Sequence, residues 1–198
     1  SPHLEQLHRW LLLRKNPLII QYRVNSGFVP SDHWVHSEGE GRSRIVGEMT
    51  HFIDLLHNIT GSRISRVHAE RIGGDNQSAV NNDNIVVTLK FEEGSVANLT
   101  YAASGDKAYS REKIEIFFEG NTVVSEDFRI SKKHFEGKTE TFKTHGQEMG
   151  YREELKHFIS LFKREESRTV TLKEAFQTMR AVFAIETSLS TGQAIRLS

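Results

Sequence analysis

The sequence lacks the residues and runs that define several large classes of protein. It has no cysteine, which excludes disulfides, thiolate metal ligands and a cysteine nucleophile. This absence fits a reducing compartment, and we expect a cytoplasmic protein. Lysine plus arginine and aspartate plus glutamate each number 26, so the basic excess typical of nucleic-acid-binding proteins is missing. No apolar run approaches the roughly 20 residues of a membrane-spanning helix, so we expect neither nucleic acid nor a membrane as a partner.

Glycine-rich phosphate-binding motifs are also missing. No Gly-x-Gly-x-x-Gly stands between a predicted strand and a predicted helix, and there is no Walker A loop. Gly39 and Gly41 precede a predicted helix, but the segment before them is typical of a polar loop rather than a strand. We therefore expect that the chain does not hold a nucleotide by itself. It begins at Ser1 without a charged-then-apolar leader, so we expect it to be cut from something longer.

The residues that are present predict one domain of the α+β class. Hydrophobic residues make up 37% and charged residues 26% of the 198 residues, as in ordinary globular proteins. Helical periodicity predicts helices over 3–14, 44–59, 149–163 and 172–189. Alternating or short apolar patterns predict strands over 18–24, 63–71, 84–92, 95–102, 113–118, 122–125, 128–135, 139–144 and 193–197. Because the strands are grouped, we expect an open, mostly antiparallel mixed sheet with helices packed on one face, and a single domain over 1–198.

The predicted helix over 44–59 carries the most informative polar residues. Arg44, Glu48, His51 and Asp54 follow one another at spacings of four, three and three residues, which places them in one stripe beside the apolar side of the helix. Histidine side chains exchange a proton near neutral pH, and a carboxylate one turn away can orient the ring. Two interpretations stay open from the spacing alone: a catalytic pair, or a solvated helix face with an ion pair.

A metal-centre interpretation depends on a second pair with the same spacing. Glu48-x-x-His51 and Glu154-x-x-His157 both match the spacing found in carboxylate-bridged di-iron bundles. That architecture needs four helices and two further glutamate ligands, whereas the middle third of this sequence is rich in predicted strands. We therefore expect no metal site, and metal analysis of the purified protein is the test.

Motifs that occur in a fixed order along nearly the whole chain carry a family resemblance. They are Tyr22-Arg23-Val24-Asn25-Ser26-Gly27, Pro30-x-Asp32-His33-Trp34, Gly39-x-Gly41-Arg42, Gly47-Glu48-x-x-His51-Phe52-Ile53-Asp54, Glu153-Glu154-x-x-x-Phe158 and Glu186-x-Ser188-Leu189-x-Thr191-Gly192. This set resembles the C-terminal domain of the glucose-fructose oxidoreductase, inositol dehydrogenase and MocA (Gfo/Idh/MocA) family. The likeness is greatest to the bi-domain oxidoreductase branch, in which this domain follows an alcohol-dehydrogenase-like half.

The resemblance implies a two-domain enzyme of which this chain is one part. An N-terminal Rossmann domain, absent from this chain, would bind most of an NAD or NADP cofactor and supply a lysine from a Glu-Lys-Pro motif. The C-terminal domain would line the substrate site and form a homo-oligomer through its sheet. Strand residues expected to supply that interface are Val86, Thr88, Val96, Ile114, Ile116 and Phe118.

The resemblance also implies roles for individual residues. His51 matches the catalytic histidine of the family pattern, whereas the carboxylate of that pattern falls on Gly47, and Glu48 stands one residue later. One helical position is a turn of about 100°, so His51 is the expected base and Glu48 its expected orienting partner. The candidate substrate-binding residues, chosen for their place beside this helix, are Arg23, Asn25 and His33.

These inferences together predict the function class. We expect the substrate-binding and oligomerisation domain of an NAD(P)-dependent oxidoreductase that acts on a sugar, nucleotide sugar, inositol or related hydroxy compound. This chain alone is expected to be inactive. The alternative is a non-catalytic binding or assembly module of the same fold.

Overall fold

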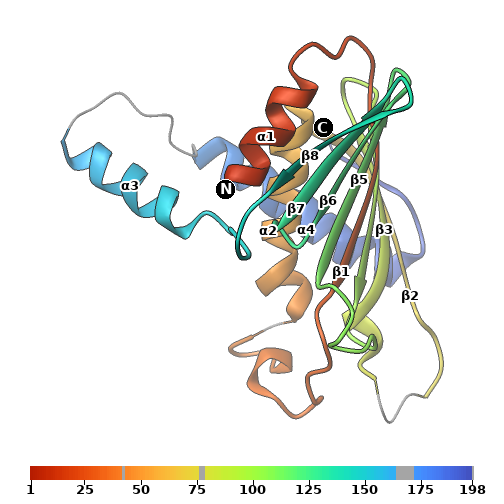
Figure 1. The fold of residues 1–198 in the computed structure, drawn as a ribbon. Helices are drawn as coiled ribbons and strands as arrows, with labels where there is room; N and C mark the ends of the chain where they lie inside the picture. Colours follow the sequence, from red (N-terminus) through yellow and green to blue (C-terminus); the bar gives the residue numbers. More distant parts are fainter. Residues whose placement is uncertain (42, 76–78, 164–171, 198) are drawn as a thin grey trace.

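A computed structural model of the chain describes residues 1–41, 43–75, 79–163 and 172–197. Within these residues one sheet has the strand order β8-β7-β6-β5-β1-β4-β3-β2-β9 (Figure 1). Its strands are β1 (Ile19–Asn25), β2 (Ile64–Arg71), β3 (Asn84–Phe91), β4 (Val96–Ala102), β5 (Glu112–Phe118), β6 (Asn121–Glu126), β7 (Ile130–Phe135), β8 (Lys138–Lys143) and β9 (Ile195–Arg196). The helices are α1 (Pro2–Leu11), α2 (Arg44–Thr60), α3 (Tyr151–Phe162) and α4 (Leu172–Thr191), with short 3-10 turns η1 (Trp34–His36) and η2 (Asn81–Asp83).

The sheet is mixed because its central strand, β1, has one parallel and one antiparallel neighbour. β1 pairs in parallel with β4 and antiparallel with β5, and the other described pairings are antiparallel. Three hairpins, β3–β4, β5–β6 and β7–β8, lie at the turns that the sequence predicts. The α+β class and the mostly antiparallel open sheet are thereby confirmed.

One face of the sheet is covered by α1, α2 and α4 (Figure 1). The apolar stripe of α2 predicted from its periodicity is buried there: Ile45, Met49 and Ile53 are each at most 2% exposed. Ile20 and Tyr22 of β1 point into the same core. Fully burying one such aliphatic side chain contributes roughly 1.5–3 kcal/mol, so this layer holds α2 firmly against the centre of the sheet.

The ends of α2 are fixed by local sequence. Ser43 caps the first turn, where its hydroxyl accepts a hydrogen bond from the Val46 amide. Gly61 ends the helix in the left-handed conformation at φ 67°, which favours glycine. The helix therefore begins at Arg44 as predicted, and this places the polar stripe on its first three turns.

The opposite face of the sheet is uncovered, and here one prediction was wrong. Ile114, Ile116 and Phe118 of β5 lie on the helix-covered face and are at most 8% exposed, so they belong to the core. A strand turns alternate side chains to opposite faces, and Glu112, which begins β5, is buried on the core side. The apolar residues on the open face are therefore not the three β5 residues that the sequence analysis suggested.

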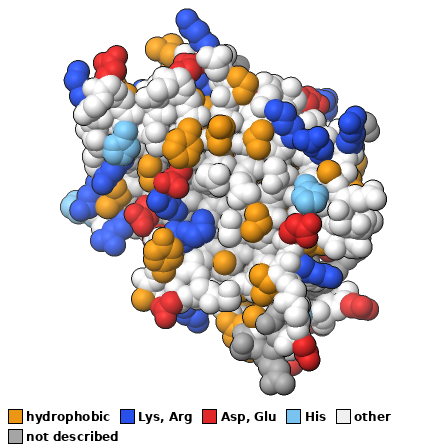
Figure 2. All heavy atoms as spheres, turned by 90° about the vertical axis from the view of Figure 1, so that its right-hand side faces the viewer, with side chains coloured by type: hydrophobic (Ala, Val, Ile, Leu, Met, Phe, Trp, Pro, Cys, Tyr) orange, Lys and Arg blue, Asp and Glu red, His pale blue; other side chains and the backbone are white. Residues whose placement is uncertain are grey.

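Three apolar side chains form a row across the open face instead. Ile19 of β1 is paired in register with Val96 of β4 on one side and Phe117 of β5 on the other. Ile19 and Phe117 are 57% and 39% exposed. Figure 2 shows this face, where hydrophobic side chains lie among charged side chains and among white atoms, which are the other side chains and the backbone.

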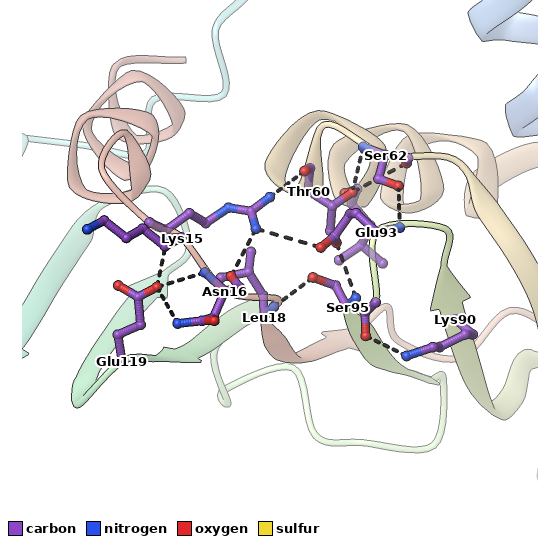
Figure 3. A network of polar contacts seen from close by, with 12 residues as sticks. Lys15, Asn16, Leu18, Thr60, Ser62, Lys90, Glu93, Ser95 and Glu119 are labelled. Atoms are coloured by element: carbon purple, nitrogen blue, oxygen red, sulfur yellow. Dashed lines mark hydrogen bonds and ion pairs between the residues drawn. The ribbon is translucent and has the colours of Figure 1, made fainter.

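A polar network locks the connection from α1 to β1 against two turns of the sheet (Figure 3). Glu119, in the β5–β6 turn, accepts hydrogen bonds from the backbone amides of Lys15 and Asn16, each at 2.7 Å. These bonds lower the pKa of the Glu119 carboxyl. The Leu18 amide donates to the hydroxyl of Ser95 at the start of β4. The network sets where β1 enters the sheet, and it lies at the opposite end of β1 from the polar stripe of α2.

Helix α3 projects away from the rest of the domain (Figure 1). Its apolar residues at helical spacing, Tyr151, Leu155 and Ile159, are 71%, 64% and 53% exposed. The predicted helix is thus confirmed, but its apolar side does not join the core of this domain. No helix in the described part of the chain combines the length and the apolarity needed to cross a membrane.

Candidate functional site

Arg44 is the centre of a buried polar network at the start of α2. Its guanidinium donates to the Gly27 carbonyl at 2.8 Å and to Glu48, one helical turn on, with an Nε–Oε1 distance of 2.8 Å. It also reaches Asp83, the last residue of η2, at 3.5 Å. The side chain is 4% exposed, so these contacts rather than water satisfy its charge. Arg44 therefore ties α2 to the segments that follow β1 and precede β3.

Glu48 has both of its carboxylate oxygens engaged. Oε1 accepts from Arg44, and Oε2 accepts from the hydroxyl of Tyr101 at 2.8 Å. Partial burial opposes ionisation of Glu48, but the hydrogen bonds from Arg44 and Tyr101 outweigh it and hold the pKa of Glu48 below its usual value. Burial raises the pKa of the Tyr101 hydroxyl well above its usual value, so it serves as a donor. Glu48 is thus a fixed anion rather than a proton acceptor.

Asp83 is the second carboxyl that faces Arg44. Its side chain is 2% exposed, and its Oδ2 lies 3.6 Å from the Nε2 atom of His36 in η1. Burial raises the pKa of Asp83, and Arg44 and His36 offset part of that rise. Arg44 is therefore shared between two carboxylates: Glu48, which is well hydrogen-bonded, and Asp83, which is strongly desolvated. The loop that holds His36 lies against α2.

His51 lies one turn beyond Glu48 on the same helix, and its side chain is exposed. In the described residues no hydrogen bond joins it to Glu48, whose oxygens are taken by Arg44 and Tyr101. His51 is therefore accessible to a molecule that approaches α2 from solvent. The pair predicted from spacing lies on one helix face, and whether the two residues act together stays a prediction.

A pocket of about 470 Å³ opens beside this network. It lies where the end of β1, the 107–111 segment before β5 and the turn between β6 and β7 meet. Ser26 and Gly27 line it, and Gly27 is the residue whose carbonyl Arg44 holds. A volume in this range is typical of small-molecule sites. The start of α2 is thus joined to the pocket wall by the hydrogen bond from Arg44 to Gly27.

The three predicted substrate-binding residues lie in different places. Asn25 is 8% exposed, lines the pocket, and donates to the Asp106 carbonyl at 2.7 Å. Arg23 lies directly behind the pocket wall: its guanidinium stacks on the Tyr109 ring, 4.4 Å from the ring centroid. His33 is exposed in the loop before η1, accepts the Val35 amide, and does not line the pocket.

Sequence reasoning missed the residues that complete the site from other elements. Tyr101, Asp83 and His36 contact the α2 network, and Lys107 and Arg129 line the pocket. Sequence spacing relates only residues within one helix or strand, so it gave no signal for contacts across β4, η1 and η2. The sequence also did not predict the turn at Asp127 and Phe128. Both residues have a positive φ angle, 51° and 47°, at positions where no glycine indicates such a conformation.

Metal ligation finds no ready site in the described residues. No group of three or more histidine, aspartate or glutamate side chains there is arranged to hold a metal ion. Gly41 is explained by packing, since a Cβ atom would lie 2.3 Å from the Cα atom of Val35. Gly41 therefore allows a close approach within the loop, whereas a Cβ atom on Gly39 would meet no other atom within 4 Å.

The comparison with protein families identifies the chain. The model of the GFO/IDH/MocA C-terminal domain matches residues 16–124, which is more than half of the sequence and includes α2 and the strands β1 to β5. The chain belongs to this family. Comparison with curated proteins gave no match.

Solved structures show the same fold at low sequence identity. An oxidoreductase domain protein from Kribbella flavida superposes with a TM-score of 0.79 at 16% identity, covering 100% of this chain and 64% of the other. An oxidoreductase from Agrobacterium radiobacter, in complex with NAD+, L-tartaric acid and magnesium, gives 0.74 at 12% identity, covering 98% and 61%. UDP-N-acetylglucosamine 3-dehydrogenase GnnA from Acidithiobacillus ferrooxidans gives 0.71 at 16% identity, covering 94% and 60%. The chain thus spans somewhat over half of the length of these relatives.

Proposed function

We propose that this chain is the substrate-binding and subunit-contact domain of an NAD(P)-dependent oxidoreductase that acts on a sugar, nucleotide sugar, inositol or related hydroxy compound. The observation that carries the proposal is the pocket joined through Gly27 to the Arg44–Glu48 network of α2, in a chain of this family. Two relatives of the same fold support it, one crystallised with NAD+ and one described as a nucleotide-sugar dehydrogenase.

A second domain is part of the proposal, because the described residues do not fit the cofactor by themselves. The sheet has one parallel pairing, β1 with β4, and among the described residues no glycine-rich turn joins a parallel strand to a helix N-terminus that could hold a diphosphate. The exposed apolar side chains Tyr151, Leu155 and Ile159 of α3 support a domain that covers them. The relatives of this fold have the extra length for such a domain.

His51 is the proposed base of this reaction. Oxidation of a carbinol requires removal of the hydroxyl proton, and an exposed imidazole on the first turns of α2 can accept it. Glu48, held ionised by Arg44 and Tyr101, places a fixed negative charge one helical turn away.

The test is turnover against pH in a protein that carries this domain together with its cofactor-binding domain. General acid–base catalysis contributes about 10²–10⁴-fold, so His51→Asn should lower kcat by that range and remove the pH dependence of the lost base. Asp54→Asn, an exposed carboxyl three residues further along α2, is the matched control and should keep kcat. Wild-type turnover of His51→Asn across neutral pH would refute the catalytic role.

Self-association through the open face of the sheet is the second part of the proposal. The row formed by Ile19, Val96 and Phe117 gives this face an apolar strip across β4, β1 and β5. Burying it against a second copy would remove exposed apolar surface from water. Because Ile114, Ile116 and Phe118 are core residues, the interface variants to make are in the row and not in those positions.

A further inference from the structure

Four cations surround the pocket, and few of them are neutralised. Lys107, Arg111 and Arg129 line it, and Arg23 lies behind its wall. Among the described residues one ion pair reaches this group, between Arg111 and Glu112, at the long distance of 3.8 Å. Uncompensated positive charge around a concave surface raises the local concentration of anions.

The acids near the pocket are occupied by other donors. Glu112 is 3% exposed and accepts the Tyr22 hydroxyl. Asp127 accepts the backbone amide of Glu112 at 2.7 Å, and Asp106 accepts the Ala108 amide at 2.7 Å. These hydrogen bonds shape β5 and the segment before it. Of the three carboxylates only Asp127 lines the pocket, where it faces the three cations Lys107, Arg111 and Arg129.

Arg23 is held in place by neutral groups, and Lys107 lies close to Gly27. Arg23 donates to the carbonyl and, at 2.8 Å, to the hydroxyl of Ser110, and its guanidinium lies on the Tyr109 ring. It therefore keeps its charge next to the pocket without an acidic partner. A Cβ atom on Gly27 would lie 3.2 Å from Cε of Lys107, so the missing side chain lets this lysine lie close over the pocket wall.

We propose that this pocket binds an anionic group, a carboxylate or a phosphate, of the hydroxy compound on which the enzyme acts, with Lys107 and Arg129 as its principal ligands. The proposal makes the proposed function more specific. It rests on that function, because only the proposed function makes the bound molecule a substrate. The pocket is linked to α2 through one shared residue, since Gly27 lines the pocket and its carbonyl accepts a hydrogen bond from Arg44. The chemistry selects acidic sugars, sugar phosphates or nucleotide sugars over neutral polyols.

Binding to the 198-residue chain tests the proposal without any turnover. The probes are glucuronate, glucose 6-phosphate and neutral glucose, titrated into ¹⁵N-labelled chain at low salt and followed by amide chemical shifts. At least one anionic probe should shift the amides of 25–27, 107–111 and 127–129, and inorganic phosphate should displace it. Glucose should cause no shifts there. The two anionic arms separate a carboxylate site from a phosphate site.

Charge removal gives the quantitative check. A charge-assisted hydrogen bond contributes enough that losing it weakens binding about tenfold, so Lys107→Gln and Arg129→Gln should each lower affinity by about that factor. The control Lys138→Gln removes a cation at the far end of the β7–β8 hairpin from Arg129 and should leave affinity unchanged. Near-identical amide spectra of the variants away from the pocket establish that they are folded.

The outcomes separate this inference from the proposed function. Absence of anion-specific shifts in this region, or equal loss of affinity in Lys138→Gln, overturns the anion site even if His51 proves essential for turnover. Conversely, anion binding that is intact in His51→Asn supports the site whatever the turnover assay shows. Shifts of equal size with glucose would also overturn it.

Discussion

Removal of Arg44 is the sharpest test of the network that positions the site. Arg44→Met keeps a long apolar stem but leaves the Asp83 carboxylate, 2% exposed, without its cation. It also removes the donor from the Gly27 carbonyl. Breaking a buried ion pair by deleting one partner costs roughly 3–5 kcal/mol of unfolding free energy.

The size of this loss has an upper bound that depends on pH. The variant can relieve the buried charge by protonating Asp83, which costs about 1.4 kcal/mol for each pH unit above the ordinary aspartate pKa. At pH 7 this route costs about 4 kcal/mol, and at pH 5 about 1.5 kcal/mol. We therefore expect Arg44→Met to lose about 3–4 kcal/mol at pH 7 and less than half of that at pH 5.

The sign follows from the two carboxyls that face Arg44. Asp83 has a raised pKa in the fold, so its ionisation costs stability above its unfolded pKa, and this cost vanishes as pH falls below that value. Glu48 has a lowered pKa, so its stabilising contribution is present above its unfolded pKa and is lost as pH falls through its folded pKa. Between pH 7 and pH 5 the difference therefore comes from Asp83, whereas the contribution of Glu48 is lost only at lower pH, below its unfolded pKa.

Urea unfolding monitored by circular dichroism at pH 7 and pH 5 measures the difference. Lys113→Met is the control, because Lys113 pairs with Glu115 at 3.0 Å on the open face with both side chains about a third exposed. Such surface pairs contribute about 0–1 kcal/mol. A loss for Arg44→Met below about 1 kcal/mol at pH 7, or one equal at both pH values, would refute the reasoning about this network.

Three further predictions concern the core, the cofactor and assembly. Ile53→Ala, at a site with 0% exposure, should lower the unfolding free energy by about 2–5 kcal/mol in the same urea assay, and a loss near zero would place α2 elsewhere. Calorimetric titration of the 198-residue chain with NAD or NADP should show no appreciable binding, and tight stoichiometric binding would contradict the need for a second domain. Sedimentation at high micromolar concentration should show self-association that Phe117→Lys weakens, whereas Lys138→Glu, away from the row, should not; a wild-type monomer at every concentration would count against the sheet interface.

Local sequence was sufficient to predict the elements and the class of fold. The hairpins of β3–β4, β5–β6 and β7–β8 and the span of α2 follow from short-range signals: alternation, glycine turns, and the Ser43 cap and Gly61 end of the helix. The stripe of Arg44, Glu48 and His51 is also a local feature, because helical spacing alone places these residues on one side of α2. The family could be named from ordered motifs before any contact was known.

Only the tertiary structure decided which residues meet. Alternation does not say which side of a strand faces the helices, and for this reason Ile114, Ile116 and Phe118 were assigned to the wrong face. Arg44 faces Asp83 and Glu48 faces Tyr101 because α2 packs over β1 and β4, whose parallel pairing joins segments about 75 residues apart. The cations of the pocket come from three separate segments, so their convergence is a property of the sheet order and not of any motif.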